Sequence, residues 1–274
     1  MQIANLDCSA KDFIVMGILN LTPDSFSDGG QYQDTDSAVQ RALQMRDQGA
    51  DIIDIGGEST RPGAQSLSAE EEIKRVVPVI RALRLVSDVA ISIDSSKAAV
   101  MQAAVAAGAN LINDVRALQQ ESALQMAQQL NVPVCLMHMQ GAPHNMQHDP
   151  CYHDVLSDVK GFLKQRVASC LEAGISREQI MIDPGFGFGK TLAHNLSLLK
   201  HLSEFAELGL PLLVGISRKS MLGQITGADV EQRVAAGLAT TVLAYQAGAQ
   251  FFRVHDVKAT VDALKVTQAV GSSK

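Results

Sequence analysis

The stretch that decides the fold is Met181-Ile182-Asp183-Pro184-Gly185-Phe186-Gly187-Phe188-Gly189-Lys190-Thr191, where an apolar run ends at a carboxylate and a proline. Pro184 fixes φ and removes a backbone N–H, so we predict a strand that stops at about Asp183. Three alternating glycines then allow positive φ or a close approach to a ligand, and Phe186 and Phe188 offer flat apolar faces. This combination predicts a strand followed by a loop that suits a planar polar ligand.

Two familiar phosphate-binding motifs do not fit this stretch. A Walker A loop requires a glycine five residues before Gly189, and that position holds Pro184. A dinucleotide fingerprint requires G-x-G-x-x-G, whereas the spacing here is G-x-G-x-G. A tight strand-to-helix turn without a ligand remains open as an alternative, but the carboxylate at the strand end favours a ligand site.

Length and composition favour one large globular domain. With 274 residues, 46% of them hydrophobic, the chain has material for a single α/β barrel, a fold of about 250 residues. Its net charge of −6 argues against a general nucleic-acid-binding or anionic membrane surface, although local basic clusters can still bind anions. We therefore expect neither a nucleic acid nor a membrane as a partner.

The cysteines and the apolar runs bear on the cellular compartment. Four widely spaced cysteines include no C-x-x-C pair, which fits buried structural thiols in a reducing compartment: Cys8, Cys135, Cys151 and Cys170. Residues 1–11 lack the apolar core of a signal peptide, and no apolar run approaches the roughly 18 residues of a membrane span. We expect a soluble cytoplasmic protein.

One pattern recurs along the chain: a short apolar run, a polar loop, a helix-like segment and often a glycine. The apolar runs predict eight strands, at Phe13–Leu19, Asp51–Ile55, Val89–Ile93, Asn110–Ile112, Pro133–Met137, Gln179–Ile182, Pro211–Ile216 and Gln250–Val254. Glycines able to adopt the left-handed conformation end four of the helix-like segments: Gly49, Gly108, Gly174 and Gly248.

Start signals precede two of the predicted helices. Asp36 and Ser37 precede a helix predicted over Ala38–Gln48. Ser68-Ala69-Glu70-Glu71 is a capping box, which predicts a helix towards Val86 that is interrupted or kinked near Pro78.

The repeat predicts the fold class. Eight units average about 34 residues each, the size of βα repeats that close into a parallel barrel. We predict an α/β fold in which residues 1–274 form a single (β/α)8 TIM barrel domain, with the active site at the C-terminal ends of the strands. A doubly wound open sheet is the structural alternative, because a sequence does not show closure.

The predicted strand ends are almost all polar. They are Asn20, Gly56–Arg61, Asp94–Ser96, Asn113–Asp114, His138, Asp183, Ser217–Lys219 and Arg253–His255. A carboxylate or amide at the end of an apolar strand costs on the order of several kcal/mol if it lacks a partner. Eight strand ends of the same character therefore predict one shared binding site.

These side chains divide by charge into two sets. Donors and acceptors for a heterocycle with several N–H groups and a carbonyl come from Asp94, Asn113, Asp183 and Lys219. Cations suited to an anion come from Arg61, Arg253 and His255. The loops after the seventh and eighth strands of a barrel often bind phosphate, and the predicted last helix starts near His255. Asn20 and a phosphorylated substrate could together hold Mg²⁺.

Four segments resemble the signatures of bacterial dihydropteroate synthases. They are GILNLTPDSFSDGG (Gly17–Gly30), DIGGESTRPG (Asp54–Gly63), DPGFGFGK (Asp183–Lys190) and SRKS (Ser217–Ser220), and the resemblance extends from about Phe13 to the final helix. It implies a transferase of folate biosynthesis that joins p-aminobenzoate to (7,8-dihydropterin-6-yl)methyl diphosphate and releases diphosphate.

The resemblance also implies a role for each motif residue. Asp94, Asn113, Asp183 and Lys219 would hold the pterin, with Asp183 facing its amino-pyrimidinone edge. Thr60, Arg61, Arg253 and His255 would hold the diphosphate, and Asn20 would bind Mg²⁺. Phe188, Ser217 and Lys219 would line the p-aminobenzoate side. Catalysis is assigned to Asp94, Lys219, Arg253 and His255, and the loops Thr22–Gln33 and Ser59–Ser66 are expected to complete the site.

Weaker features and other functions stay as alternatives. His144, His148, Cys151 and His153 lie close in sequence, but their spacing matches no common zinc pattern. Val234–Ala247 is small and apolar on more than one face, which predicts packing on the barrel and against a second subunit in a homodimer. A pterin-binding methyltransferase domain of the cobalamin-dependent type, or a non-catalytic pterin-binding module, would share the pterin pocket.

Overall fold

The computed structural model describes residues 1–21, 31–59, 66–141 and 146–273, without the side chains of residues 31–34. Thr60, Arg61 and His144 lie outside these ranges, as do most of the two loops predicted to complete the site.

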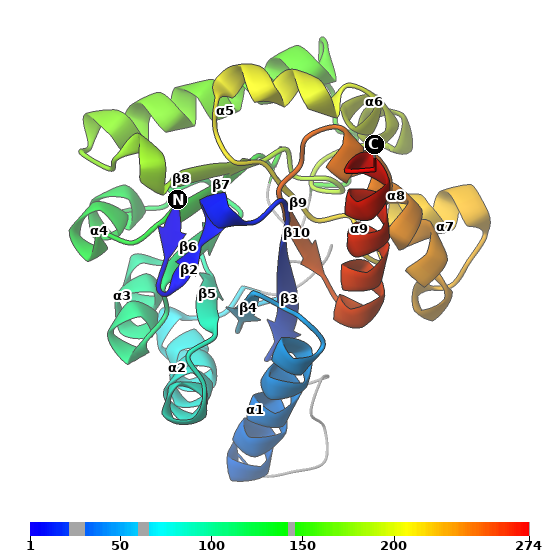
Figure 1. Cartoon of the computed structure of the whole chain (residues 1–274). Coiled ribbons are helices and arrows are strands. Elements are labelled where there is room, and N and C mark those ends of the chain that lie inside the picture. Colours follow the sequence, from blue (N-terminus) through cyan, green and yellow to red (C-terminus); the bar gives the residue numbers. More distant parts are fainter. Residues whose placement is uncertain (22–30, 60–65, 142–145, 274) are drawn as a thin grey trace.

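Eight parallel strands form the sheet that organises the molecule (Figure 1). Their order is β8-β7-β6-β5-β4-β3-β10-β9, and a parallel bridge between Ile182 and Leu212 joins the two edges of this sheet. The strands are β3 (Ile14–Asn20), β4 (Ile52–Gly56), β5 (Ala90–Asp94), β6 (Leu111–Asp114), β7 (Val134–Met137), β8 (Ile180–Asp183), β9 (Leu213–Val214) and β10 (Phe251–Val254). The predicted (β/α)8 TIM barrel is confirmed, and the open-sheet alternative is wrong.

The strand boundaries lie within two residues of their predicted positions, and β8 ends at Asp183 as predicted. The strand β9 is the shortest of the eight, at two residues instead of the predicted six from Pro211 to Ile216. Pro211 has no N–H to donate to a neighbouring strand, and Gly215 weakens a strand interior. These two residues account for the shortening.

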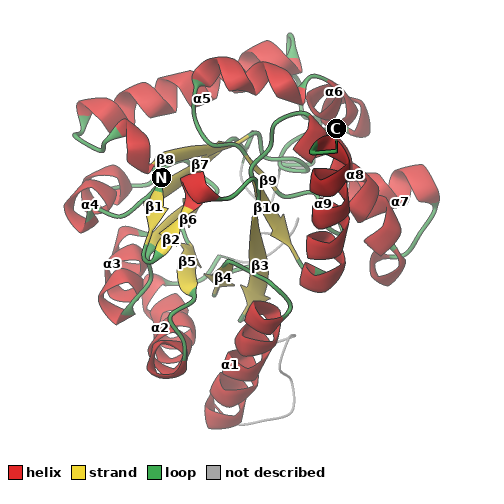
Figure 2. Ribbon diagram, viewed as in Figure 1, coloured by secondary structure: helices red, strands yellow, loops and turns green. Residues whose placement is uncertain are grey.

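Helices surround the strands on the outside (Figure 2). They are α1 (Gln31–Asp47), α2 (Ala69–Val86), α3 (Ala98–Ala107), α4 (Ala123–Leu130), α5 (Val155–Glu172), α6 (Leu192–Lys200), α7 (Ser220–Thr226), α8 (Val234–Gln246) and α9 (Val257–Gly271). The four predicted helix-ending glycines all have positive φ, at +102°, +120°, +94° and +95°.

Helix α1 begins earlier than predicted. It starts at Gln31, so Asp36 and Ser37 lie inside the helix instead of preceding it. The preference of such residues for helix starts is a modest local effect, whereas burial of apolar residues from Ala38 to Met45 against the barrel stabilises the whole helix. Tertiary packing therefore outweighed the start signal.

Helix α2 confirms one prediction and corrects another. Ser68 Oγ accepts the Glu71 N–H at 3.2 Å, and Glu71 Oε2 accepts the Ser68 N–H at 3.2 Å, as a capping box requires. The helix continues through Pro78, so the predicted interruption there is wrong. Its buried face runs on across the proline to Leu83, and this packing offsets the lost hydrogen bond.

Side-chain alternation along the strands separates two apolar regions. One face of each strand packs outwards against the helices, through residues such as Val15, Ile53 and Phe252. The other face points into the barrel, where Met16, Ile52 and other residues fill its N-terminal end. The outer region buries the strand-facing side of the helices, and the inner region fills the N-terminal end of the barrel.

A short hairpin that the sequence did not predict covers the N-terminal end of the barrel. Its strands are β1 (Gln2–Ile3) and β2 (Leu6–Asp7), drawn in dark blue in front of the barrel in Figure 1. Ile3 is fully buried within the inner apolar cluster, together with Met16 and Phe251. This hairpin leaves the opposite end, which we call the barrel mouth, as the end where polar side chains gather.

All four cysteines are free thiols. Cys8, Cys135 and Cys170 are buried, as predicted, whereas Cys151 is exposed. Within the described ranges, no helix combines the length and the apolar character that a membrane crossing requires.

Candidate active site

A buried cluster of one cation and two carboxylates lies inside the barrel below its mouth. Arg253 Nε donates to Asp54 Oδ2 at 2.6 Å, and Arg253 Nη2 donates to Asp94 Oδ2 at 2.6 Å. The Asn113 amide donates to the two Asp54 oxygens at 3.3 and 3.5 Å. Strands β4, β5, β6 and β10 thus each contribute one polar side chain to the same point.

The electrostatics of this cluster are set by two buried carboxylates and one guanidinium. Two carboxylates share one guanidinium, and the Asp54 and Asp94 side chains are only 0% and 6% exposed. Burial raises the pKa of Asp94 to about 7, with Arg253 opposing the shift and Asp54 adding to it. The carboxylates in turn raise the pKa of Arg253, which stays charged although it is buried.

Asp183 occupies the neighbouring position at the end of β8. Its Oδ1 accepts the Gly185 N–H at 2.7 Å, and the residue is 5% exposed. Burial raises the pKa of Asp183, while the Gly185 hydrogen bond and the charges of Lys219, Lys190 and Arg253 oppose the shift. Asp183 and Arg253 therefore lie at the same end of the barrel, as the predicted site requires.

Lys219 reaches the site from the segment between β9 and α7. Its ammonium donates to the Phe186 carbonyl and lies 3.9 Å from the centroid of the Phe188 ring. Burial lowers the pKa of Lys219 to about 7, and the carboxylate of Asp183 opposes that shift. Lys219 can thus change its charge near neutral pH.

The loop after β8 has the conformation that its glycines predicted, with one correction. Gly185, Gly187 and Gly189 have φ of +70°, +79° and +62°. Phe188 faces the mouth, in a small cluster with Met137, Met139 and Met146. Phe186 is fully buried in the outer core, so the prediction that it offers a face to a ligand is wrong. Phe186 and Phe188 are two residues apart with a positive-φ glycine between them, and their rings point to opposite sides of the loop.

His255, predicted at the anion end, lies against Ser217, predicted on the p-aminobenzoate side. The His255 N–H donates to Ser217 Oγ at 3.2 Å, and the same hydroxyl lies 3.1 Å from His255 Nδ1. Arg218 does not join them, because its guanidinium donates to Asp256 at 3.1 and 2.7 Å. Arg218 therefore ties the segment after β9 to the start of α9.

The comparisons with known proteins identify the family of this chain. Residues 16–255 match the family model described as pterin binding enzyme. The chain belongs to the pterin-binding enzyme family. It is 52% identical over 259 residues to the dihydropteroate synthase of Haemophilus influenzae, with 94% of each chain covered.

Solved structures of family members have the same fold. A dihydropteroate synthase from Yersinia pestis, in a sulfonamide drug complex, superposes with a TM-score of 0.94 at 52% identity over 100% of this chain and 99% of that chain. One from Xanthomonas albilineans with 4-aminobenzoic acid gives a TM-score of 0.92 at 49% identity over 100% of both chains.

Asp54 is a polar residue of the buried cluster that the sequence analysis did not single out. It lies in the middle of β4, not at its end, and its neighbours Ile53 and Ile55 are fully buried. A charged residue inside an apolar strand is the signal that could have found it, since such a group requires partners. Its partners are Arg253 and Asn113.

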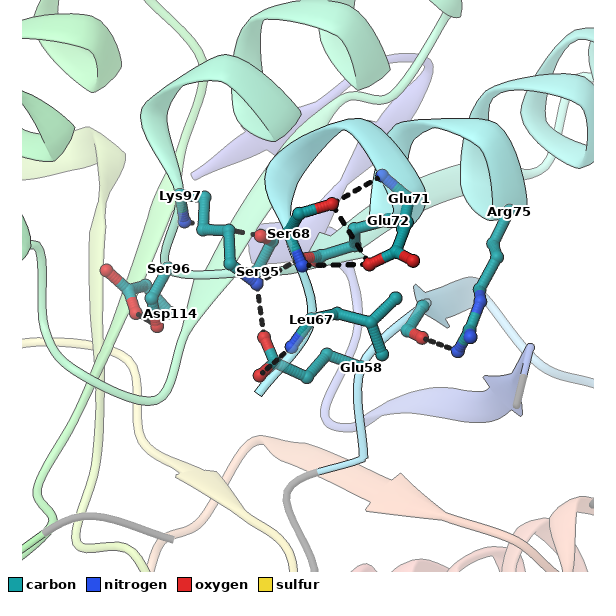
Figure 3. A network of polar contacts seen from close by, with 11 residues as sticks. Glu58, Leu67, Ser68, Glu71, Glu72, Arg75, Ser95, Ser96, Lys97 and Asp114 are labelled. Atoms are coloured by element: carbon teal, nitrogen blue, oxygen red, sulfur yellow. Dashed lines mark hydrogen bonds and ion pairs between the residues drawn. The ribbon is translucent and has the colours of Figure 1, made fainter. Parts of the chain in front are cut away.

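A second charged cluster supports the rim of the site (Figure 3). Lys97, at the start of α3, donates to Glu58 after β4 and to Glu72 of α2, the latter at 2.5 Å. The Glu58 carboxylate also accepts the Leu67 N–H at 3.2 Å. Glu72 has a fully buried side chain, so Lys97 balances a charge inside the protein.

The residues around Asn20 can be tested for a magnesium ion. An added Cβ on Gly56 would lie 3.6 Å from Asp94 Oδ2 and 3.7 Å from Asn20 Oδ1, so both oxygens face the same space. Within the described residues, no group of three or more His, Cys, Asp or Glu side chains could hold a metal. Mg²⁺ keeps several waters and borrows phosphate oxygens, so one amide oxygen fits an ion that arrives with a diphosphate.

Proposed function

We infer that this chain is a transferase of folate biosynthesis. It joins p-aminobenzoate to (7,8-dihydropterin-6-yl)methyl diphosphate, releases diphosphate and forms 7,8-dihydropteroate. The observation that carries this inference is the polar mouth, where the buried Asp94, Asn113 and Asp183 lie close to Lys219. It is found in a chain that is 52% identical to a dihydropteroate synthase along 94% of both sequences.

The pterin is proposed to bind between the carboxylates. Asp183 accepts hydrogen bonds from the amino-pyrimidinone edge, since an ionised carboxylate offers acceptors to adjacent N–H groups. Asp94 and Asn113 bind the rest of the ring, and Lys219 donates to a ring carbonyl or nitrogen. The burial of all three acidic and amide side chains supports this placement, because a planar ligand would satisfy groups already removed from water.

The diphosphate is proposed to bind Thr60, Arg61, Arg253 and His255. His255 follows β10 directly before the first turn of α9, where helix N–H groups favour an anion. Arg253, two residues earlier, faces the same interior and stands between this end and the pterin carboxylates.

The p-aminobenzoate side is proposed to comprise Phe188, Ser217 and Lys219. Phe188 lies against Lys219, and Ser217 lies against His255, so the three side chains are continuous with the other two subsites. The Xanthomonas albilineans relative was solved with 4-aminobenzoic acid, which supports an aryl carboxylate as the second substrate.

The reaction follows from the charge on the leaving group. The cationic residues stabilise negative charge as the bond between the methylene carbon and the diphosphate oxygen breaks. The pterin ring stabilises positive charge on that carbon, so bond cleavage runs ahead of attack. The arylamine nitrogen then bonds to the carbon and loses a proton, and no covalent bond to the enzyme forms.

Mg²⁺ is proposed as the cofactor, held by Asn20 and by the diphosphate of the substrate. It would supply further positive charge at the leaving group. Asn20 presents its amide oxygen at the mouth beside Asp94, which is where a diphosphate attached to a pterin would lie.

Diphosphate release tests the reaction. The purified chain is given the pterin diphosphate with or without p-aminobenzoate, and with Mg²⁺ or with a chelator. We expect rapid release of diphosphate and formation of 7,8-dihydropteroate when both substrates and Mg²⁺ are present. Binding of the pterin without any diphosphate release would instead identify a non-catalytic pterin-binding module.

The alternative of a cobalamin-dependent methyltransferase domain is not favoured. The relative at 52% identity is a dihydropteroate synthase matched along nearly its whole length. Such a methyltransferase would also have no use for the cations that follow β9 and β10.

A homodimer and a cytoplasmic location complete the proposal. Leu243 of α8 is 54% exposed, and Val266 and Val270 of the adjoining α9 are 65% and 69% exposed, which supports contact with a second subunit there. Free thiols support a reducing compartment. Strands from Ile14 to Val254 join one sheet, which supports a single domain over residues 1–274.

A further inference from the structure

Lys190, the last residue of the DPGFGFGK segment, is a buried lysine outside the proposed substrate contacts. It is 3% exposed. Among the described residues, no carboxylate lies within ion-pair distance of its ammonium. Burial lowers the pKa of Lys190 well below its ordinary value, with the charge of Asp183 opposing the shift, so the charged form is costly unless other groups solvate it.

Backbone carbonyls and one imidazole solvate the ammonium instead. Lys190 Nζ lies 2.8 Å from the Gly185 carbonyl oxygen, 3.0 Å from that of Phe188 and 3.4 Å from that of His138. It also lies 2.9 Å from His138 Nδ1. Burial lowers the pKa of His138 to about 3, which leaves the imidazole neutral and able to accept. One side chain thus joins both ends of the glycine loop to the end of β7.

The glycine loop, residues 185–189, packs closely against the backbone that follows β7. A Cβ on Gly185 would lie 1.9 Å from the His138 carbonyl oxygen, and one on Gly189 would lie 2.4 Å from that of Gln140. On the other side, Asn195 Oδ1 accepts the Gly187 N–H at 2.7 Å. The loop therefore has little room to rearrange while the ammonium is in place.

The opposite side of the same loop holds Lys219. The Phe186 carbonyl accepts from its ammonium, the Phe188 ring lies beneath that ammonium, and Gly187 leaves room for its methylene chain. Lys190 and Lys219 thus interact with one loop from two sides, and Phe188 is shared: its carbonyl faces Lys190 and its ring faces Lys219.

We propose that Lys190 is a positioning residue for the second substrate. Its side chain donates hydrogen bonds to the carbonyls of Gly185, Phe188 and His138. These bonds hold the Phe188 ring and the Phe186 carbonyl in place against Lys219, on the p-aminobenzoate side. The proposal rests on the proposed function of that side. It requires that loss of Lys190 weaken the use of p-aminobenzoate more than the use of the pterin diphosphate.

The test is the steady-state kinetics of Lys190→Met, which keeps an unbranched but slightly shorter side chain and donates no hydrogen bond. We expect KM for p-aminobenzoate to rise roughly 10- to 100-fold, because small displacements of positioning groups have effects of that size, while KM for the pterin diphosphate changes less than about threefold. Equal changes in both KM values, or no change in either, would overturn the proposal.

Arg84→Met is the matched control. Arg84 likewise gathers backbone carbonyls, those of Ser87, Val89 and Gly108 at 3.2, 2.9 and 2.8 Å, but at the N-terminal ends of β5 and β6. We expect this variant to lower the melting temperature without changing the ratio of the two KM values. A selective rise in KM for p-aminobenzoate in Arg84→Met would show that general loosening of the barrel suffices, and would overturn the proposal.

His138→Leu is the second variant, in case Lys190→Met does not fold. It removes the imidazole acceptor and keeps the carbonyl contacts, so a smaller rise in the same KM is expected. An unchanged ratio of KM values would contradict the proposal. A wild-type chain that forms no 7,8-dihydropteroate would refute the proposed function itself, which separates the two failures.

Discussion

The two ends of the barrel interior are built from the same strands and have opposite chemistry. We call the N-terminal end of the barrel, filled by the inner apolar cluster, the closed end. Four polar residues of the mouth each follow, by two positions, an apolar residue of this closed end: Asp54 after Ile52, Asn113 after Leu111, Asp183 after Met181 and Arg253 after Phe251. Side chains two apart on a strand face the same side, so each pair points inwards. The closed end holds the barrel together, and the mouth holds charges that would be costly without partners.

This contrast shows that the two ends of one barrel serve stability and ligand binding separately. At the closed end every inward position gains from burial, and the β1–β2 hairpin completes the cluster with Ile3. At the mouth, Asp54 and Asp94 are as buried as those apolar residues, and the partly buried Arg253 must satisfy both carboxylates. Substitutions at the two ends should therefore affect different measurements.

The largest effect is expected for Arg253→Met. It removes the cation shared by Asp54 and Asp94, and with it a donor proposed to stabilise the leaving diphosphate, so kcat/KM should fall about 10³-fold. Initial rates of diphosphate release measure it. Full turnover by this variant would exclude Arg253 from the proposed diphosphate site.

Phe251→Ala, two residues earlier on the same strand, is the counterpart. The Phe251 ring is 1% exposed at the closed end, so its truncation should lower the free energy of unfolding by about 3 kcal/mol. Urea denaturation measures that loss, and both KM values should stay near wild type at a temperature where the variant is folded. A large change in either KM would mean that the two ends are not independent.

Lys97→Met tests the charged cluster at the rim of the mouth. The Glu72 carboxylate would stay fully buried without its cation, and we expect a loss of about 2 kcal/mol in the free energy of unfolding. Lys160→Met is the control, because Lys160 also lies between two glutamates, Glu204 and Glu207, but both are solvent-exposed. Equal losses in the two variants would show that burial of Glu72 is not what matters.

The smallest effect is expected in the pH dependence of kcat/KM. Lys219 has its pKa lowered to about 7, so its ammonium loses the proton above that pH, and kcat/KM should fall up to tenfold per pH unit there. Lys219→Arg should retain its charge and lose this alkaline limb. A limb that survives in Lys219→Arg would assign it to another group.

The free energy of unfolding should also depend on pH through Lys219, and it should increase as the pH rises. Between pH 7 and the ordinary lysine pKa of 10.5, the unfolded chain binds a proton at Lys219 that the folded chain has lost. Stability therefore gains a contribution from Lys219 as the pH rises through this window. Urea denaturation at several pH values should show a larger gain in the wild type than in Lys219→Arg, where the lowered pKa of Lys190 leaves a contribution of the same sign.

Much of the fold followed from local patterns. Apolar runs bounded by glycine, proline and polar residues located all eight strands, because alternation and turn chemistry act over a few residues. The start of α1 and the passage of α2 through Pro78 were mispredicted, since packing against the barrel outweighed a local signal in each case. The β1–β2 hairpin has strands of two residues, too short for any period to appear.

The sequence by itself determined which residue types end each strand. Because the ends of parallel strands meet at one end of a barrel, it also determined that carboxylates, amides and cations gather there. Its motifs also determined the family. Only the tertiary structure decided the partners: Arg253 with Asp54 and Asp94, Lys219 with the Phe188 ring, and Lys190 with three carbonyls. The physical reason is that strand periodicity fixes the side of the sheet on which a residue lies, whereas a contact such as that between Arg253 and Asp54, 199 positions apart, depends on how the barrel closes.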